Sequence, residues 1–173
     1  EQYIDKKYTV ETRFNQATGM PTHMVWSNEH GVAEAPGDLP AEMIFDDKGL
    51  LKLAIWKKDG EAHRDNDLPA KIAYNPETRK PIAYTWCQNG VQERQGEAGK
   101  PSYLQVYDSG RLCALEFTKD GEHWREGGKP PYITFDEHDG TAYDADENVI
   151  EFDGYDQSWL PESDDMSVNL DYS

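Results

Sequence analysis

The segment from His63 to Asp67 places one histidine, one arginine and two aspartates within five positions. A histidine beside a carboxylate is a pairing that enzymes use for proton transfer, because the imidazole titrates near neutral pH and the carboxylate can orient it. His63 with Asp67 is therefore the first candidate for a catalytic dyad in this chain. Whether the segment is a site or part of the scaffold depends on the elements that position it.

The chain repeats itself with a period of about 30 residues. Aromatic residues recur as Trp26, Trp56, Trp86 and Phe117, at spacings of 30, 30 and 31. Each ring is followed by a glycine (Gly31, Gly60, Gly90, Gly121), and then by a proline (Pro40, Pro69, Pro101, Pro130). A second aromatic residue follows five or six positions later (Phe45, Tyr74, Tyr107, Phe135). Four columns in phase over more than 100 residues indicate tandem structural repeats.

The repeats carry the residues of tight hairpin turns. Asp59-Gly60, Asn89-Gly90 and Asp120-Gly121 are typical of two-residue type I′ turns, in which both central residues have positive φ. His30-Gly31 is a weaker equivalent in the first repeat, and a second turn follows the second aromatic residue. The sequence therefore predicts an all-β fold, an antiparallel meander or elongated β-hairpin repeat array, with no helix of note.

The period also divides the chain into three parts. Residues 1–24 are expected to form an N-terminal capping strand segment, because Tyr8, Val10, Thr12 and Phe14 alternate with polar residues. Residues 25–143 contain four repeats, with boundaries near 25–53, 54–83, 84–114 and 115–143. Residues 144–173 break the pattern and form an irregular segment of acidic and aromatic residues.

The period places the His63–Asp67 segment in the loop between the tight turn and Pro69. The full set of polar groups occurs in this repeat alone, whereas the other repeats use the same loop to connect strands. We therefore favour a structural role, in which Arg64 and Asp67 hydrogen-bond the backbone of their own loop and His63 packs beside Trp56.

The stretch from Trp56 to Ala70 resembles a known repeat unit, W/Y-x-x-x-G-x-x-H-R-x-x-x-x-P-A. This unit occurs in tandem arrays of large DNA viruses, phages and some bacteria and is loosely similar to MORN repeats. The match is close in repeat two, partial in repeats one and four, and poor in repeat three, where the loop is two residues longer. The resemblance implies a β-hairpin architecture and a habit of binding macromolecules, and it implies no reaction. Trp26, Trp56, Trp86, Phe117, Gly60, Gly90, Gly121, His63, Arg64 and Pro69 are the residues we assign to the structural repeat.

The negative charge of the chain is concentrated at its C-terminal end. The net charge is -17, and 13 of the 34 acidic residues lie between Asp136 and Ser173, a stretch without lysine or arginine. The first 135 residues contain 21 acids and 17 bases, so the body is nearly balanced. The two cysteines, Cys87 and Cys113, form no metal-binding pattern, which favours a reducing, cytoplasmic setting.

The acidic C-terminal segment is the candidate binding surface. Carboxylates interleaved with rings resemble a single-stranded nucleic acid in charge and stacking, and could occupy a basic groove that binds one. Asp144-x-Asp146-x-Asn148 opens like a calcium loop but lacks its glycine and its final glutamate, and a solvated disordered tail is the simpler alternative. We predict partner contacts at Asp144, Asp146, Glu147, Glu151, Phe152, Asp153, Tyr155, Asp156, Trp159, Glu162, Asp164 and Asp165.

The sequence contains no catalytic or nucleotide-binding motif. G-x-S-x-G, H-E-x-x-H, P-loop and dinucleotide fingerprints are all missing, and a carboxylate pair of the glycosidase type stays open. We expect no enzyme, no metal and no cofactor. The favoured function is a phage anti-defence or immunity-type inhibitor that binds a basic protein, such as a nucleic-acid-handling enzyme or a toxin, without binding nucleic acid or membrane itself. A carbohydrate-binding module with exposed Trp and Tyr, and a structural or virion component, are the alternatives.

Overall fold

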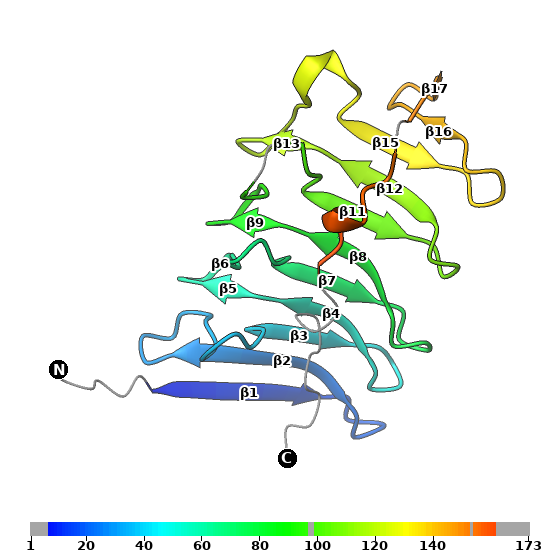
Figure 1. Ribbon diagram of the computed structural model, residues 1–173. Helices are drawn as coiled ribbons and strands as arrows, with labels where there is room; N and C mark the ends of the chain where they lie inside the picture. Colours follow the sequence, from blue (N-terminus) through cyan, green and yellow to red (C-terminus); the bar gives the residue numbers. More distant parts are fainter. Residues whose placement is uncertain (1–6, 97–98, 153, 162–173) are drawn as a thin grey trace.

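The computed structural model describes residues 7–96, 99–152 and 154–161 and shows an all-β protein. Over these residues, eleven strands form one antiparallel meander sheet, and three small hairpins lie along one side of it (Figure 1). The eleven strands are β1 (Tyr8–Phe14), β2 (Pro21–Asn28), β3 (Glu42–Phe45), β4 (Leu51–Ile55), β7 (Lys71–Tyr74), β8 (Pro81–Thr85), β11 (Tyr103–Val106), β12 (Leu112–Glu116), β15 (Tyr132–Phe135), β16 (Ala142–Tyr143) and β17 (Val149–Ile150). The hairpins pair β5 (Lys57–Lys58) with β6 (Glu61–Ala62), β9 (Cys87–Gln88) with β10 (Val91–Gln92), and β13 (Thr118–Lys119) with β14 (Glu122–His123). The predicted antiparallel meander is confirmed.

The three small hairpins have the predicted turn conformation. Asp59 and Gly60 have φ values of 52° and 82°, and the equivalent residues of the next two hairpins have nearly the same values. Asparagine and aspartate tolerate this left-handed region better than most residues, and glycine adopts it freely. The dipeptides read from the sequence therefore fix the place and the type of three turns.

The turn of the first repeat is wider than predicted. Gly31 has a φ of 75°, but His30 is not among the residues with positive φ. The side chain of Asn28 forms the turn instead, because its Oδ1 accepts from the backbone N–H groups of His30 and Val32. A histidine has no short side-chain oxygen for such a bond, so the asparagine two residues earlier organises this turn.

Asx turns join the strands on the opposite side of the sheet. Asp46, Asn75 and Asp136 each accept backbone N–H bonds through Oδ1 at the position that follows the second aromatic residue. Asn15 does the same between β1 and β2. These turns confirm the second turn predicted for each repeat.

One face of the sheet carries the core. Residues directly opposite each other on antiparallel strands lie on the same face, and the pairing runs without a break from β3 to β15. This row is almost fully buried and consists of Met43, Ala54, Ile72, Tyr84, Leu104, Leu115 and Ile133. A single apolar row of this kind agrees with the low hydrophobic content of the sequence, 36%.

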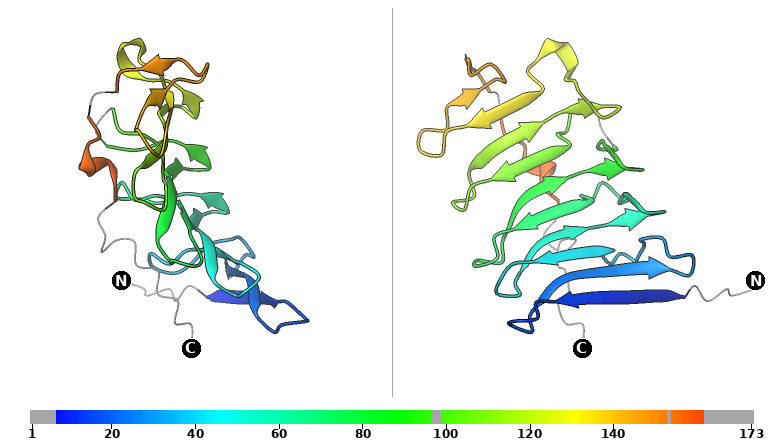
Figure 2. Two further views of the ribbon diagram at one scale, coloured as in Figure 1. Left: turned by 90° about the vertical axis from the view of Figure 1, so that its right-hand side faces the viewer. Right: turned by 180° about the vertical axis from the view of Figure 1, so that it is seen from behind.

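The C-terminal segment folds back across the core face. After β17 the chain descends over the sheet, and the 3-10 helix η2 (Gln157–Trp159) lies against the middle strands (Figures 1 and 2). Phe152 packs edge-on against Phe135 at 5.1 Å between ring centroids, and Trp159 packs edge-on against Phe117 at 5.8 Å. Residues 144–152 and 154–161 are therefore part of the folded body rather than a solvated tail.

The sheet begins with β1, which lies at its edge and pairs with β2 over seven residues. This strand forms where the alternation of Tyr8, Val10 and Thr12 predicted one. Across the described ranges, the helical structure consists of η1 (Glu126–Gly128) and η2 (Gln157–Trp159), and neither is long or apolar enough to span a membrane.

Candidate functional site

Each repeat from the second onward stacks an arginine on its aromatic ring. The guanidinium carbon of Arg64 lies 3.9 Å from the ring centroid of Trp56, and that of Arg94 lies 3.9 Å from Trp86. Arg125 lies over Phe117 in the same way, at 4.2 Å. The arginine follows its ring by eight residues in all three repeats, a column that our sequence analysis missed.

A carboxylate from the preceding repeat holds each of the first two arginines. Asp38 accepts two bonds from Arg64, at 3.1 and 2.8 Å, and Asp67 accepts two from Arg94, at 2.7 and 3.2 Å. The indole Nε1 groups of the rings, Trp56 and Trp86, donate to the backbone carbonyls of the same aspartates. Each aspartate thus bonds a ring and an arginine of the next repeat, which joins consecutive repeats.

The arginines also bond the prolines of their own repeats. Arg64 Nη1 donates to the Pro69 carbonyl at 3.2 Å, and Arg94 Nη1 donates equivalently to Pro101. The expectation that Arg64 binds its own loop is therefore confirmed. The same expectation for Asp67 is wrong, because its carboxylate binds Arg94 and Lys100 of the following repeat. The partner of Asp67 depends on how one repeat stacks on the next, and the sequence of a single loop does not specify that stacking.

His63 also acts between repeats. Its Nδ1 lies 3.1 Å from the backbone nitrogen of Asn89, and its Nε2 lies 2.8 Å from Asp65 Oδ1. Because a backbone N–H can only donate, Nδ1 must accept, so Nε2 carries the proton that is donated to Asp65. Both nitrogens of this buried ring are thus engaged, and Asp67 points to a different partner. His63 and Asp67 do not converge into a dyad.

The charge environment of Asp67 matches its structural role. Partial burial would raise the pKa of its carboxyl group, but the hydrogen bond and charge of Arg94, with those of Lys100, lower the pKa below its usual value. Glu42 on β3 behaves alike, because Lys57 and His23 offset the effect of burial and lower its pKa. The body of the array therefore neutralises these acids with nearby cations.

The repeat glycines allow the hairpins to stack. Gly60 N–H donates to the Ala33 carbonyl of the preceding repeat, and Gly90 N–H donates to the Ala62 carbonyl. A Cβ atom built on Gly121 would lie 2.9 Å from Val91, which is too close for a side chain. Gly121 is therefore required both by the turn and by the approach of the neighbouring hairpin, whereas Gly60 and Gly90 are required by the positive φ of their turns.

The first repeat departs from this pattern. Glu34 occupies the place that an arginine fills in the later repeats, eight residues after Trp26. The indole Nε1 of Trp26 is buried and has no hydrogen-bond partner within the part of the chain that the structure describes. No earlier repeat precedes it in this sheet to offer a carbonyl, because β1 lies at that edge.

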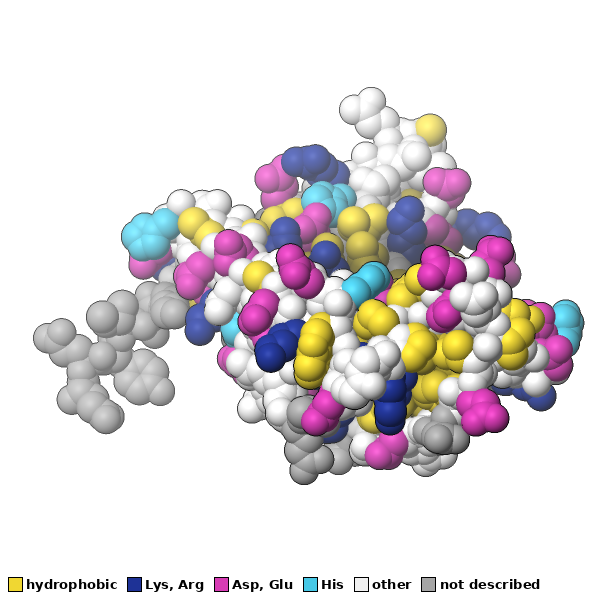
Figure 3. All heavy atoms as spheres, turned by 90° about the horizontal axis from the view of Figure 1, so that it is seen from above, with side chains coloured by type: hydrophobic (Ala, Val, Ile, Leu, Met, Phe, Trp, Pro, Cys, Tyr) yellow, Lys and Arg dark blue, Asp and Glu magenta, His cyan; other side chains and the backbone are white. Residues whose placement is uncertain are grey.

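Of the predicted partner-binding acids that the structure describes, Asp144 is half-buried and the others are exposed. Asp144, Asp146 and Glu147 lie in the turn between β16 and β17, and Glu151 and Asp156 follow on the segment that crosses the core face. Seen from the β17 end of the sheet, apolar side chains gather in a patch whose border carries acidic and some basic side chains (Figure 3). Asp153, Glu162, Asp164 and Asp165 lie outside the described residues.

Backbone N–H groups keep several of these carboxylates ionised. Bonds from the amides of Thr141, Asn148 and Ser158 lower the pKa values of Asp139, Asp144 and Asp156, respectively. Asp144 uses both carboxylate oxygens to close its turn, since Oδ1 accepts from the backbone of Asp146 and Asn148 and Oδ2 accepts from the Asn148 side chain. This turn accounts for the calcium-like spacing without an ion, and no metal-binding group of three or more His, Cys, Asp or Glu occurs among the described residues.

The three predicted partner-binding rings differ in their availability. Trp159 is 9% exposed and belongs to the core, and its carbonyl accepts a 2.8 Å bond from Arg94. Phe152 is half-buried between Phe135 and Trp159. The structure thus gives Phe152 and Trp159 an intramolecular role, whereas Tyr155 packs edge-on against Trp159 at 6.2 Å between ring centroids and stays 37% exposed.

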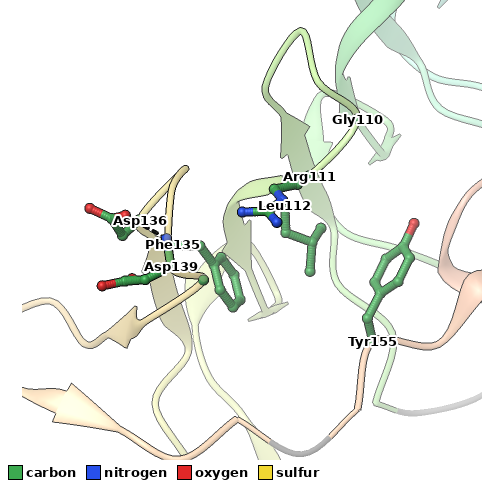
Figure 4. Close-up of a pocket in the computed structure, with 8 residues that line it drawn as sticks. Gly110, Arg111, Leu112, Phe135, Asp136, Asp139 and Tyr155 are labelled. Carbon is green, nitrogen blue, oxygen red and sulfur yellow. Dashed lines mark hydrogen bonds between the residues drawn. The ribbon is translucent and has the colours of Figure 1, made fainter.

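A shallow cavity of about 350 Å³ lies beside Tyr155. The Tyr155 ring stands across it from Leu112 and Phe135, and Asp136 and Asp139 line its outer side with their carboxylates pointing outward (Figure 4). Arg111 lines the same cavity, and its Nη1 donates to the backbone carbonyls of Glu137 and His138, so the border of this apolar hollow carries charges of both signs.

The chain matches no protein-family model, no curated protein and no solved structure in comparisons with each. The similarity to the W/Y-x-x-x-G-x-x-H-R repeat therefore stays a prediction, and the geometry of the site carries the functional argument.

Proposed function

We propose that this protein is a non-catalytic binding protein that engages a basic protein surface with the acidic end of its β-repeat array. The end consists of the turn between β16 and β17, the segment that follows β17, and the cavity beside Tyr155. Its biological form would be an inhibitor, either of a nucleic-acid-handling enzyme or of a basic toxin. Carboxylates and rings would occupy positions that phosphates and bases fill in such a partner.

One observation supports this proposal above the others: all the ion pairs of the described residues use acids of the body, and none uses an acid of the acidic end. Every ion pair within the described residues uses an acid between Glu11 and Glu116. None involves Asp136 or a later residue, and that stretch has no lysine or arginine of its own. A surface of unneutralised carboxylates repels phosphate and attracts cationic proteins.

The polar groups that first pointed to catalysis support the same proposal indirectly. His63, Arg64 and Asp67 are all engaged in contacts between repeats, at distances from 2.7 to 3.2 Å. Groups held in this way stabilise the array and are poorly placed to meet a substrate.

The carbohydrate alternative gains no support from the tryptophans. Trp56 and Trp86 are 5% and 1% exposed, and an arginine covers one face of each ring. Trp159 is also buried, which leaves Trp124 as the exposed indole of the array. A cytoplasmic location is part of the proposal, since Cys87 and Cys113 are both free thiols.

The test is to neutralise the acidic end and measure binding as a function of salt. The full chain is used to isolate a partner from a native lysate, and affinity for the purified partner is then measured by calorimetry at low and moderate salt. The combined variant Asp146→Asn, Glu147→Gln, Glu151→Gln changes exposed side chains that form no hydrogen bond or ion pair within the described residues. We expect it to weaken binding by about tenfold or more and to flatten the salt dependence.

The matched control removes three negative charges elsewhere. Asp47→Asn and Glu77→Gln lie on exposed turns of the body and Glu61→Gln lies on β6, also exposed, and together they change the net charge by the same amount. Affinity should stay within about twofold of the unmodified chain, because screening limits the reach of distant charges. Equal loss in both variants, or an affinity that does not depend on salt, would refute the proposal.

A further inference from the structure

The outer edge of β1 is an open strand edge. Across the described residues β1 pairs on one side only, with β2, and it is seven residues long with no proline (Figures 1 and 2). Long edge strands expose unpaired N–H and C=O groups and readily accept another strand. Most natural edges are shortened, bulged or charged to prevent this, as β17 is at the other end, with two residues followed directly by Glu151.

The backbone groups that face outward on β1 can be assigned from the bonds of β2. Trp26 turns both of its backbone groups away from β1, since its N–H donates to Ala41 and its carbonyl accepts from Glu34. Backbone direction alternates along a strand, so the neighbours of Trp26 face β1 and bond its odd-numbered residues. The outward-facing residues of β1 are therefore Tyr8, Val10, Thr12 and Phe14.

Apolar side chains are exposed at the same edge. Val10 is 47% exposed and Phe14 is 59% exposed, and Met20 in the adjoining turn is 46% exposed. These are three of the seven large hydrophobic side chains that are exposed over the described residues. An apolar surface beside free backbone groups fits an incoming strand better than it fits solvent.

We propose that β1 pairs with β1 of a second copy of this chain, antiparallel and with Thr12 opposite Thr12. This register places Val10 opposite Phe14 of the second copy, so that the outward-facing backbone groups meet. It also places Glu11 opposite Arg13 of the second copy, twice by symmetry. The dimer has one continuous sheet across its twofold axis.

The charges of Glu11 and Arg13 favour this register over the register shifted by two positions. Glu11 and Arg13 lie between the outward-facing positions, where directly opposed side chains approach most closely in an antiparallel pair. Both are exposed, at 74% and 68% of their side-chain surfaces, and the 3.6 Å ion pair that they form with each other on one strand would be exchanged for pairs with the second copy. A shift of two positions would place Glu11 opposite Glu11 of the second copy, and like charges at that spacing destabilise the pair.

The charge of the whole molecule favours the same edge. Residues 1–24 contain three acids and three bases, whereas the residues from Asp136 onward contain acids only. The turn between β16 and β17, which carries Asp144, Asp146 and Glu147, lies at the opposite end of the sheet from β1 (Figure 1). Pairing through β1 therefore keeps these acidic turns of the two copies as far apart as the fold allows.

A charge exchange tests the proposal. Sedimentation velocity of the full chain over a wide concentration range should show a monomer–dimer equilibrium. Glu11→Arg alone and Arg13→Glu alone each oppose like charges, and each should weaken dimerisation by about tenfold. The double exchange restores opposite charges and should recover the dimer, with circular dichroism as a check on folding. A monomer at all concentrations, or a double exchange no stronger than the single variants, would overturn the proposal.

A cysteine scan tests the register independently. Thr12→Cys places two thiols opposite each other across the twofold axis, at a spacing of roughly 5.5 Å between Cα atoms that permits a disulfide. Mild oxidation should give a reducible covalent dimer from Thr12→Cys and none from Glu11→Cys or from the unmodified chain with its native cysteines. Cross-linking through Glu11→Cys instead would mean that the other register forms and would refute the one proposed.

Discussion

The two ends of the sheet differ in how far they are open to pairing with another strand. At the C-terminal end, β17 is two residues long, acids surround it, and the chain folds back to bury Trp159 on the core face. At the N-terminal end, β1 is seven residues long with Val10 and Phe14 exposed, and Trp26 beneath it lacks the bond that Trp56 and Trp86 make. The C-terminal end is therefore protected from strand pairing by its acids and by the shortness of β17, whereas the N-terminal end is open to pairing.

The largest expected effect concerns the closure of the C-terminal end. Trp159→Ala removes a buried ring that contacts Phe117 and Phe152, and should lower the free energy of unfolding by about 3–5 kcal/mol. Trp124→Ala is the matched control, because Trp124 is 48% exposed, and should cost less than about 1 kcal/mol. Chemical denaturation measures both. Equal effects would show that the segment after β17 does not close the core.

A second prediction contrasts the paired acids of the body with the unpaired acids of the C-terminal end. The pKa of Asp67 is lowered in the folded state, despite burial, by Arg94 and Lys100, so its ionised form stabilises the fold. That contribution is complete above the unfolded-state pKa of about 3.9 and disappears as the pH falls through the lower folded-state pKa. Asp67→Asn should therefore cost about 1–2 kcal/mol at neutral pH and less near pH 3.

The control for this pH dependence is Asp146→Asn, which changes an exposed side chain without an ion pair in the described part of the chain. Its free energy of unfolding should follow that of the unmodified chain across the whole pH range. If the difference for Asp67→Asn did not shrink at acid pH, the bond to Arg94 would not stabilise the fold through the ionised carboxylate.

The smallest effect compares the same substitution in the first and second repeats. Trp56→Phe removes the indole N–H that bonds the Asp38 carbonyl, whereas Trp26→Phe removes an N–H without a partner in the described residues. The first substitution should cost about 1 kcal/mol more than the second, measured by thermal or chemical unfolding. Phe117 occupies the equivalent position in the fourth repeat, so the smaller ring fits this place in the array. The reverse order would indicate that Trp26 is bonded in solution.

Local patterns predicted the hairpins of this fold well. The Asp-Gly and Asn-Gly dipeptides and the 30-residue spacing of rings located the turns and the meander, because turn dihedrals depend on adjacent residues. The alternation around Val10 located β1 for the same reason. The turn at His30-Gly31 was the exception, since its geometry depends on Asn28 rather than on the dipeptide.

Contacts between distant residues could not be predicted in this way. Asp67 bonds Arg94, 27 residues later, and Arg94 bonds the carbonyl of Trp159, 65 residues later. Nothing within either loop specifies these partners, because they follow from how the repeats stack and how the chain returns. The rings of the acidic segment were assigned to a partner for this reason, although Phe152 and Trp159 pack on Phe135 and Phe117 of the same chain.

Amide hydrogen exchange, measured by NMR at a low and a high protein concentration, compares the two ends of the sheet most directly. The outward-facing amides of Val10, Thr12 and Phe14 should become protected as the concentration rises. The amides of Val149 and Ile150 in β17 should exchange at the same rate in both samples. Exchange at β1 that does not change with concentration, or protection that grows equally at β17, would contradict the account of one open and one closed end.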